Sequence, residues 1–340
     1  MSFPTALSYD DVLLVPKYSD ILSRKEVDLS SNLDNERVLT LPIISSPMDT
    51  ITESSMANLM ASSGGLGIIH RYNSIEMQVQ LAYQVKDRDK RAAAIGITGD
   101  YLERAQALYE VGVKIFCLDV AHGHHILMQK AIKNLKSLYG DVHIMAGNVA
   151  TKKGFEDLSN WGADSIRCNI GSGSICSTRI QTGHGMPGLQ TIFECFSAEI
   201  TRDVKIIADG GIKNSGDIVK ALAAGADLIM IGSLLSGTAE TPGQIIHAAD
   251  GSRKKIYRGM ASKEAQRDWK GKYSSNEGVS TTVPAKGSAK QVLEDLDNGI
   301  RSGLSYSGAR DILELQMDSE FIVQTPSGQS ESKTHIHFRK

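Results

Sequence analysis

The segment 169–185 combines a thiol, hydroxyls and glycines in a pattern that fits nucleophilic chemistry. Cys176 lies in its middle, among glycines that leave few side chains to pack. A cysteine on a polar, glycine-rich loop is accessible, and neighbouring amides favour its thiolate, which is the reactive form. Thr178 follows two residues later, where its hydroxyl can move protons to or from the same reacting centre. The pattern predicts a cysteine nucleophile with a proton relay; the alternative is a long loop with a spectator cysteine.

A second constellation has the composition of a phosphate site. Asp209, Gly210 and Gly211 follow one apolar run, and Gly232 and Ser233 follow the next. Glycine amides and the N-terminus of a following helix present N–H donors to an anion. Asp209 beside them can accept two hydrogen bonds from a ribose diol. The ligand expected from these residues is a nucleoside monophosphate.

Eight short apolar runs, separated by helix-like stretches, must position these residues. The runs are 43–46, 66–70, 92–97, 115–119, 143–146, 165–169, 205–208 and 228–231, and amphipathic stretches include 53–63, 101–111, 125–138, 152–161, 189–198 and 217–224. This alternation predicts an α/β protein with a single-domain (β/α)₈ TIM barrel, with a doubly wound open sheet as the alternative.

Polar residues or glycines stand at or just beyond the carboxyl ends of seven of these runs, where barrel active sites lie. They are Ser46, His70, Asp119, Asn148, Gly171, Asp209 and Gly232. Taken singly, Asp119 could cap a helix and His70 could be a buried, hydrogen-bonded histidine. Together they predict that the active site lies at this end of the barrel.

The composition argues against several classes of partner. The 37 basic and 39 acidic residues give a net charge of -2, which offers no electrostatic reason for binding nucleic acid or an anionic membrane. No apolar stretch reaches about 18 residues, and Asp10 and Asp11 interrupt the N-terminal segment where a signal peptide would be apolar. Cys117, Cys168 and Cys195 lack paired spacing and fall in apolar patterns, so we expect reduced core thiols in a cytoplasmic protein.

The chain continues well past the eighth run. Residues 267–287 are polar and without a clear period, so we expect a mobile flap over the site that belongs to a catalytic domain of residues 1–325. Residues 326–340 are expected to form a flexible tail. His335 and His337 are then solvated tail residues rather than metal ligands.

Ten phrases in order resemble the IMP dehydrogenase/GMP reductase family over nearly the whole chain. They are SYDDVLLVP near the start, SSPMDT at 45–50, GLGIIHR at 65–71, DVAHGH at 119–124, AGN at 146–148, GSGSIC at 171–176, ADGGI at 208–212, MIGS at 230–233, YRGMAS at 257–262 and IRSGLSYSGA at 300–309. The resemblance implies a (β/α)₈ barrel assembled as a homotetramer.

The resemblance also assigns roles to residues. It implies that Cys176 attacks purine C2, with Thr178 and Glu277 as the proton relay. The positions that match substrate contacts are Ser46, Met48, Asp209, Gly210, Gly211, Gly232, Ser233, Tyr257, Gly259 and Met260. Those that match the cofactor pocket are Asp119, Ala121, Asn148 and Gly171, and backbone carbonyls of Gly171, Gly173 and Cys176 match a K⁺ site.

The chain departs from the family pattern at several points. Asn169 stands where glycine is expected, Ala121 replaces a serine and Gly188 replaces a glutamine. Many dehydrogenases of the family carry two regulatory CBS modules, but the corresponding connection here is only residues 86–91. Regulation through such modules is therefore excluded.

The length of the flap favours one reaction over its relative. Dehydrogenases of the family use an Arg-Tyr pair on a long flap to activate water, whereas residues 260–277 are short and lack that pair. This favours a GMP reductase, which converts GMP to IMP and ammonia with NADPH. The alternative is an IMP dehydrogenase using NAD, because the phrases GSGSIC, ADGGI and YRGM resemble those of the dehydrogenases more closely. A non-catalytic nucleotide-binding barrel is disfavoured by the presence of Cys176, Thr178 and Glu277.

Overall fold

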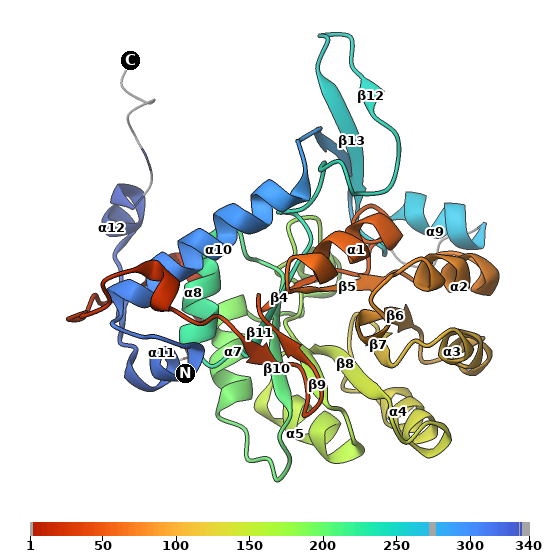
Figure 1. Ribbon diagram of the computed structural model, residues 1–340, viewed down its shortest axis with the longest axis horizontal. Coiled ribbons are helices and arrows are strands. Elements are labelled where there is room, and N and C mark those ends of the chain that lie inside the picture. The colour runs from red at the N-terminus through yellow and green to blue at the C-terminus, as the bar shows by residue number, and fades with distance from the viewer. Residues whose placement is uncertain (1–2, 272–276, 333, 335–340) are drawn as a thin grey trace.

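The structure is a computed structural model that describes residues 3–271, 277–332 and 334. Eight parallel strands close into a barrel at its centre (Figure 1). They are β4 (Ile43–Ser45), β5 (Leu66–Ile69), β6 (Ala92–Ile95), β7 (Ile115–Asp119), β8 (His143–Val149), β9 (Ser165–Cys168), β10 (Lys205–Asp209) and β11 (Leu228–Ile231). The predicted (β/α)₈ barrel is confirmed, and each strand begins at the residue where its apolar run begins.

Helices surround the barrel and cover the outer faces of its strands. They are α1 (Ser54–Ser62), α2 (Ile75–Tyr83), α3 (Tyr101–Glu110), α4 (Ile126–Leu138), α5 (Lys152–Trp161), α7 (Gly188–Phe196), α8 (Ser215–Ala223) and α10 (Ala289–Tyr306), while the short α6 (Thr178–Thr182) begins at a residue that lines the cavity at the strand ends. Helix α10 follows β11 in the barrel order and packs against α8. There Gly303 permits close contact, since a Cβ at that position would lie 2.5 Å from a methyl of Val219.

Capping residues mark the starts and ends of these helices. The Ser74 hydroxyl accepts a hydrogen bond from the Met77 amide at the start of α2, and Thr151 does the same for Gly154 at the start of α5. Gly162 ends α5 with a φ of 112°, which a glycine adopts readily, and lets the chain turn into β9. The short connections that result hold the strand ends in a fixed array.

The apolar residues form two layers of core, as a barrel requires. One layer lies between strands and helices, and Phe116 and Phe155 are among its largest fully buried side chains. The other fills the barrel interior, and two of its members, Leu33 and Leu39, come from a hairpin outside the barrel strands. That hairpin pairs β2 (Ser31–Asn32) with β3 (Val38–Leu39) and closes the amino-terminal end of the barrel.

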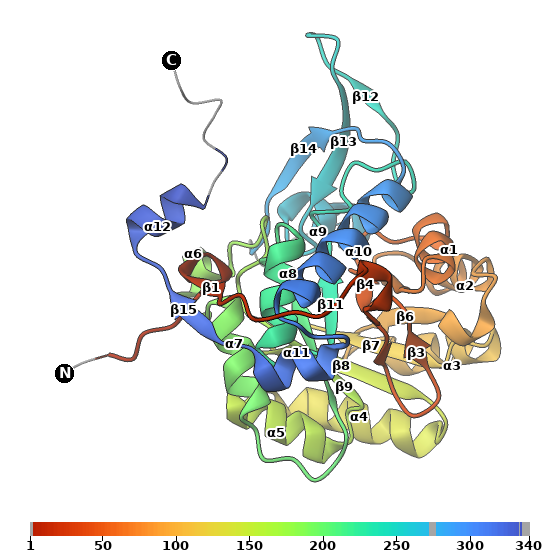
Figure 2. The same cartoon turned by 60° about the vertical axis from the view of Figure 1, so that its left-hand side comes forward.

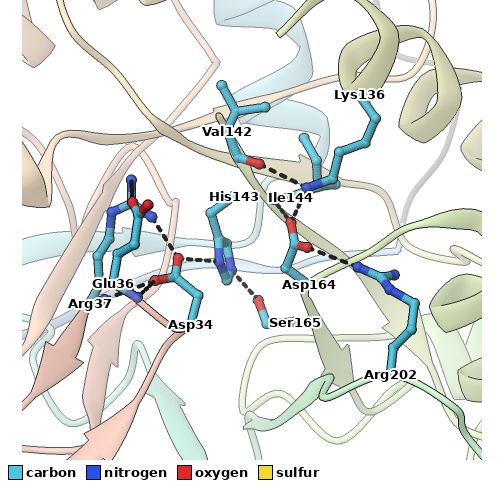
Figure 3. A network of polar contacts seen from close by, with 10 residues as sticks. All are labelled: Asp34, Glu36, Arg37, Lys136, Val142, His143, Ile144, Asp164, Ser165 and Arg202. Atoms are coloured by element: carbon cyan, nitrogen blue, oxygen red, sulfur yellow. Dashed lines mark hydrogen bonds and ion pairs between the residues drawn. The ribbon is translucent and has the colours of Figure 1, made fainter. Parts of the chain in front are cut away.

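A polar network fastens this hairpin to the strand starts, and Figure 3 shows it. His143, fully buried at the start of β8, places Nδ1 2.9 Å from Asp34 Oδ2 and Nε2 2.8 Å from Ser165 Oγ. Burial alone would raise the pKa of Asp34, but hydrogen bonds from His143 and the Glu36 amide hold it well below its usual range. Beside this network Asp164 accepts hydrogen bonds from the Ile144 amide and from Lys136. We refer to these contacts as the floor network.

Several elements lie outside the barrel. A three-stranded antiparallel sheet of β12 (Ile246–His247), β13 (Arg253–Arg258) and β14 (Ser280–Pro284) projects from the molecule, with α9 (Lys263–Lys270) at its base (Figure 2). At the opposite side β1 (Val12–Leu14) pairs with β15 (Phe321–Val323), and α11 (Ile312–Asp318) and α12 (Pro326–Glu331) flank that pair. Among the residues that the structure describes, no helix is long and apolar enough to cross a membrane.

The irregular flap expected over residues 267–287 is corrected at both of its described ends. Residues up to Lys270 complete α9, whose start is capped by the Ser262 hydroxyl, and Ser280–Pro284 form β14. β14 is held by backbone hydrogen bonds to β13. Because these bonds do not depend on the type of side chain, the strand shows no apolar period in the sequence. The expected tail begins with α12, which has no buried residue. His335 and His337 lie outside the described residues.

Candidate active site

A cavity of about 280 Å³ opens at the carboxyl ends of the barrel strands. Every site residue that the sequence predicts lines it: Cys176, Thr178 and Glu277; Ser46, Met48, Asp209, Gly210, Gly211, Gly232, Ser233, Tyr257, Gly259 and Met260; Asp119, Ala121, Asn148, Gly171 and Gly173. Of the seven residues expected at the strand ends, His70 does not line it. Its ring accepts the Tyr72 amide and lies 3.3 Å from Glu53, so it is a buried structural histidine.

Cys176, Thr178 and Glu277 form a continuous hydrogen-bonded chain. The Cys176 thiol donates to Thr178 Oγ1 over 3.2 Å, and the Thr178 hydroxyl donates to Glu277 Oε2 over 2.9 Å. A proton can therefore leave the sulfur through the hydroxyl and reach the carboxylate, and the reverse path can deliver it to a leaving group. The predicted relay is thus assembled in space although its members are 99 residues apart.

Backbone pairing between the flap and the catalytic loop places Glu277. The amide of Ser177 donates to the Glu277 carbonyl, and the amide of Val279 donates to the Ile175 carbonyl, each over 3.0 Å. Gly278 lies between them, and a Cβ there would come within 2.9 Å of the Ser262 amide nitrogen. A residue with a side chain would therefore push the flap, and Glu277 with it, away from Thr178.

Burial separates Cys176 from the other three cysteines. Cys117, Cys168 and Cys195 are buried in the core, as predicted, whereas Cys176 is only partly buried. Burial raises the pKa of Cys117 to about 12, and that of Cys168 well above its ordinary value. Neither thiol is available as a thiolate, so Cys176 is the nucleophile that the arrangement supports.

The opposite end of the cavity has hydroxyls and glycine amides in the pattern of an anion site. Ser174 Oγ and the Tyr257 hydroxyl lie 3.3 Å apart, and Gly211 and Ser233 line the cavity beside them. Burial raises the pKa of Tyr257, so that it is a neutral O–H donor. A Cβ at Gly232 would lie 3.2 Å from Met48 Sδ and 3.4 Å from Ser46 Oγ, so glycine keeps this wall open. These groups can bind a phosphate.

A buried arginine that sequence reasoning missed joins the two sides of the cavity. Arg167 in β9 donates from Nη1 to Asp119 Oδ1 over 2.7 Å, and its Nη2 lies 2.9 Å from Asp209 Oδ2. Asn148 Nδ2 also donates to Asp209 Oδ2, over 2.8 Å. Burial alone would raise the pKa of Asp119, but Arg167 and Arg71 outweigh it and hold that pKa below its usual range. Arg167 thereby keeps Asp119 ionised, and its hydrogen bonds orient both carboxylates.

Arg167 did leave a signal in the sequence. It is the charged residue within the apolar run 165–169, where an unpaired charge would be very costly to bury. Two aspartates at the ends of runs 115–119 and 205–208 were its available partners, but their proximity depends on barrel closure. Arg71 and Tyr72 were missed likewise, although both line the cavity.

Asn169 occupies a structural position in the catalytic loop. Its side-chain amide donates to the Asp209 carbonyl and to Ser172 Oγ, which ties the loop to the end of β10. The Gly173 carbonyl accepts a hydrogen bond from the Cys176 amide over 3.0 Å. This bond forms a tight turn in the loop whose carbonyls would hold K⁺. In the described part of the chain no three His, Cys, Asp or Glu side chains are placed to hold a metal ion.

Comparison with known proteins gives a consistent result. Residues 6–335 match the model of the IMP dehydrogenase / GMP reductase domain. The chain is 38% identical to an inosine-5'-monophosphate dehydrogenase of Cryptosporidium parvum, over 97% of this chain and 94% of that protein. It is 32% identical to the corresponding protein of Nitrosopumilus maritimus, over 98% of this chain and 99% of that one. Among solved structures, a cysteine-to-alanine variant of Trypanosoma brucei GMP reductase in complex with guanosine 5'-monophosphate superposes with a TM-score of 0.92, at 30% identity and 98% coverage of both chains.

Proposed function

The chain belongs to the IMP dehydrogenase / GMP reductase family of purine nucleotide oxidoreductases, and within that family we propose that it is a GMP reductase. The reaction is the NADPH-dependent conversion of GMP to IMP and ammonia. The short segment 260–277, which lacks an Arg-Tyr pair, favours the reductase over the dehydrogenase. The observation that carries the chemistry is the chain from Cys176 through Thr178 to Glu277. It supplies both a nucleophile and an acid, which is what removal of an amino group requires.

The chemistry follows from the positions of these groups. Thr178 passes the thiol proton to Glu277, and the Cys176 thiolate adds to C2 of the guanine. Glu277 then returns a proton through Thr178 to the 2-amino group, which leaves as ammonia, so that the purine stays bound to sulfur. Bound NADPH supplies the hydride that replaces the C2–S bond with a C2–H bond and frees the thiolate. By the family resemblance, Asp119 and Asn148 would line the pocket for the nicotinamide.

The nucleotide would lie across the cavity from this relay. Ser174, Ser233 and Tyr257 donate to its phosphate, and Asp209 accepts from its ribose. In the described contacts Arg167 and Asn148 both bond to Oδ2 of Asp209, which leaves Oδ1 for a ribose hydroxyl. The residue composition therefore fits a purine nucleoside monophosphate.

A paired assay of the two directions tests the proposal. We expect oxidation of NADPH in the presence of GMP, no reduction of NAD⁺ in the presence of IMP, and no activity from the Cys176→Ala protein. Repeating the assay with NADH identifies the reductant. Rapid NAD⁺ reduction with IMP, without NADPH oxidation by GMP, would instead establish the alternative, an IMP dehydrogenase that uses a base other than an Arg-Tyr pair.

Two further features belong to the proposal. Carbonyls of Gly171, Gly173 and Cys176 would hold a K⁺ ion, which is checked by replacing K⁺ with Li⁺ in the assay. The assembly is a homotetramer in solution, which is checked by analytical ultracentrifugation. Both are carried by the family resemblance.

A further inference from the structure

A second cavity, of about 260 Å³, adjoins the phosphate end of the active-site cavity and takes no part in the chemistry above. Both cavities are lined by Ser174, Gly211 and Ser233, which belong to the group of residues proposed to surround the phosphate. The other walls of the second cavity include Tyr9 from the N-terminal segment and Gly188 at the start of α7. We refer to it as the rear cavity. A group joined to the phosphate of the nucleotide would enter it.

A departure from the family pattern keeps the rear cavity open. Gly188 stands where the resemblance predicts glutamine. A Cβ added to Gly188 would lie 3.0 Å from Cε2 of Tyr9 and 3.5 Å from its hydroxyl oxygen. A side chain at this position would therefore crowd the Tyr9 ring and take up part of the space beside its hydroxyl.

The Tyr9 hydroxyl is a hydrogen-bond donor that lacks a protein acceptor. The residue is only 4% exposed and lines the rear cavity, and its hydroxyl bonds to no residue in the described part of the chain. Burial raises the pKa of Tyr9, so the group is a neutral O–H. Buried hydroxyls are almost always paired, so this one points to an acceptor on a ligand.

Positive charge lines the same cavity. Arg179 and Lys213 are both among its lining residues. Arg179 donates to backbone carbonyls, and no carboxylate of the described residues pairs with it. The start of α7 also borders the cavity, and Pro187 there supplies no side-chain cap. A helix start without a cap and two cations favour an anion as the ligand.

One carboxylate lines the rear cavity as well, and it is already balanced. Asp10 pairs with Lys213 over 2.5 Å, and both side chains are about half exposed. An exposed ion pair of this kind is weak, so Lys213 can turn from Asp10 to a phosphate at little cost.

We propose that the rear cavity binds the second phosphate of a purine nucleoside 5′-diphosphate, whose first phosphate occupies the place of the monophosphate. Tyr9, Arg179 and Lys213 donate to this second phosphate. The diphosphate therefore competes with the monophosphate for the active site. The inference rests on the proposed function only in requiring that the active-site cavity bind a purine nucleoside monophosphate, and it holds for either direction of the reaction.

The test measures binding by calorimetry. GMP and GDP are titrated into the wild type, Gly188→Gln and Lys213→Gln, with Lys153→Gln as the control, since Lys153 is exposed on α5 and pairs with Asp157 over 2.7 Å. Loss of a charge-assisted hydrogen bond, or of the space for the phosphate, should weaken GDP binding about ten-fold in the first two variants. Their affinity for GMP should stay within about two-fold of the wild type, because an exposed ion pair contributes little. The control should match the wild type for both ligands.

Asp10→Asn should change the affinity in the opposite direction. The amide no longer competes for Lys213, so GDP should bind about two- to five-fold tighter while GMP binding is unchanged. This variant and Lys213→Gln alter exposed side chains, so they test the cavity even if Gly188→Gln does not fold.

The outcomes separate the rear cavity from the proposed function. Equal binding of GDP by Lys213→Gln, Asp10→Asn and the wild type, or equal losses of GMP and GDP in the variants, would overturn the rear-cavity proposal alone. Binding of inorganic phosphate to the GMP complex, without binding of GDP by the wild type, would assign the cavity to a free ion and overturn it too. Failure of the wild type to bind GMP, IMP, GDP or IDP would remove the proposed function as well.

Discussion

Glu277 is the proposed source of the proton that ammonia needs in order to leave. Glu277→Gln keeps the hydrogen bond from Thr178 but cannot take up or return a proton. We expect release of ammonia to slow by about 10²- to 10⁴-fold, while GMP binding stays within about two-fold of the wild type. Rapid-quench measurement of ammonia, beside calorimetric binding of GMP, checks both values. Normal ammonia release by this variant would show that the proton comes from another group.

Asp209 offers a second test, because its carboxylate serves both a ribose and Arg167. Asp209→Asn keeps the shape but removes the ion pair and one acceptor. A loss of about 1–3 kcal/mol corresponds to a KM for GMP about 5- to 150-fold higher. Steady-state kinetics at saturating cofactor give this value. An unchanged KM would mean that the ribose lies elsewhere.

At this scale the sequence predicted residues that a local motif identifies better than residues whose role depends on distant partners. Cys176 and Thr178 could be predicted because their types and spacing suit the chemistry, and Glu277 through the family resemblance. Arg167 could not, since its significance depends on two carboxylates brought to it from β7 and β10.

Among the elements, the hairpin β2–β3 depends on the floor network. His143→Phe removes the hydrogen-bond partner of the Asp34 carboxylate and of the Ser165 hydroxyl. We expect a loss of about 2–4 kcal/mol in the free energy of unfolding, measured in urea. Lys114→Met, which breaks the exposed pair of Lys114 with Asp141, is the control and should cost at most about 1 kcal/mol. Equal losses in the two variants would contradict the role of the floor network.

A truncation just before the helix α12 tests whether the C-terminal segment contributes to the site. Removal of residues 326–340 deletes an element without buried residues, so kcat/KM should stay within about two-fold. Removal from residue 320 also deletes β15 and its pairing with β1, and should lower the melting temperature. Loss of activity in the shorter truncation would mean that the tail contributes to the site.

The barrel strands were predictable because each is a short apolar run, and every start agrees with the structure, whereas several ends differ, as in β6, which ends at Ile95, and β8, which continues to Val149. The projecting sheet was not, because β12 and β14 bury no residue, β13 buries only Lys255 and Tyr257, and the three strands are held by backbone hydrogen bonds. The helix α9 was not predicted either, because most of its residues are polar.

The molecule as a whole has a stability that depends on pH through Asp227. Burial raises the pKa of this carboxyl to about 6, even though it accepts the Ile206 amide. A pKa raised by folding adds stability below the unfolded value, and that stability is lost as pH rises toward 6. About two pKa units correspond to roughly 3 kcal/mol. Asp227→Asn should match the wild type near pH 4 and be more stable near pH 7, as measured by thermal unfolding; a difference that does not vary with pH would contradict this.

Arg167 has a consequence for how the two ligands bind. One guanidinium contacts both Asp119, which we propose to line the dinucleotide pocket, and Asp209, which we propose to bind the nucleotide. A purine nucleotide that hydrogen-bonds to Asp209 changes the electrostatic potential at Asp119, and with it the affinity for the dinucleotide. Thermodynamic linkage then makes the effect reciprocal: by whatever factor one ligand alters the affinity of the other, the second alters the first equally. We therefore expect the coupling between the two ligands, and with it the affinity of the dead-end complex, to depend on Arg167.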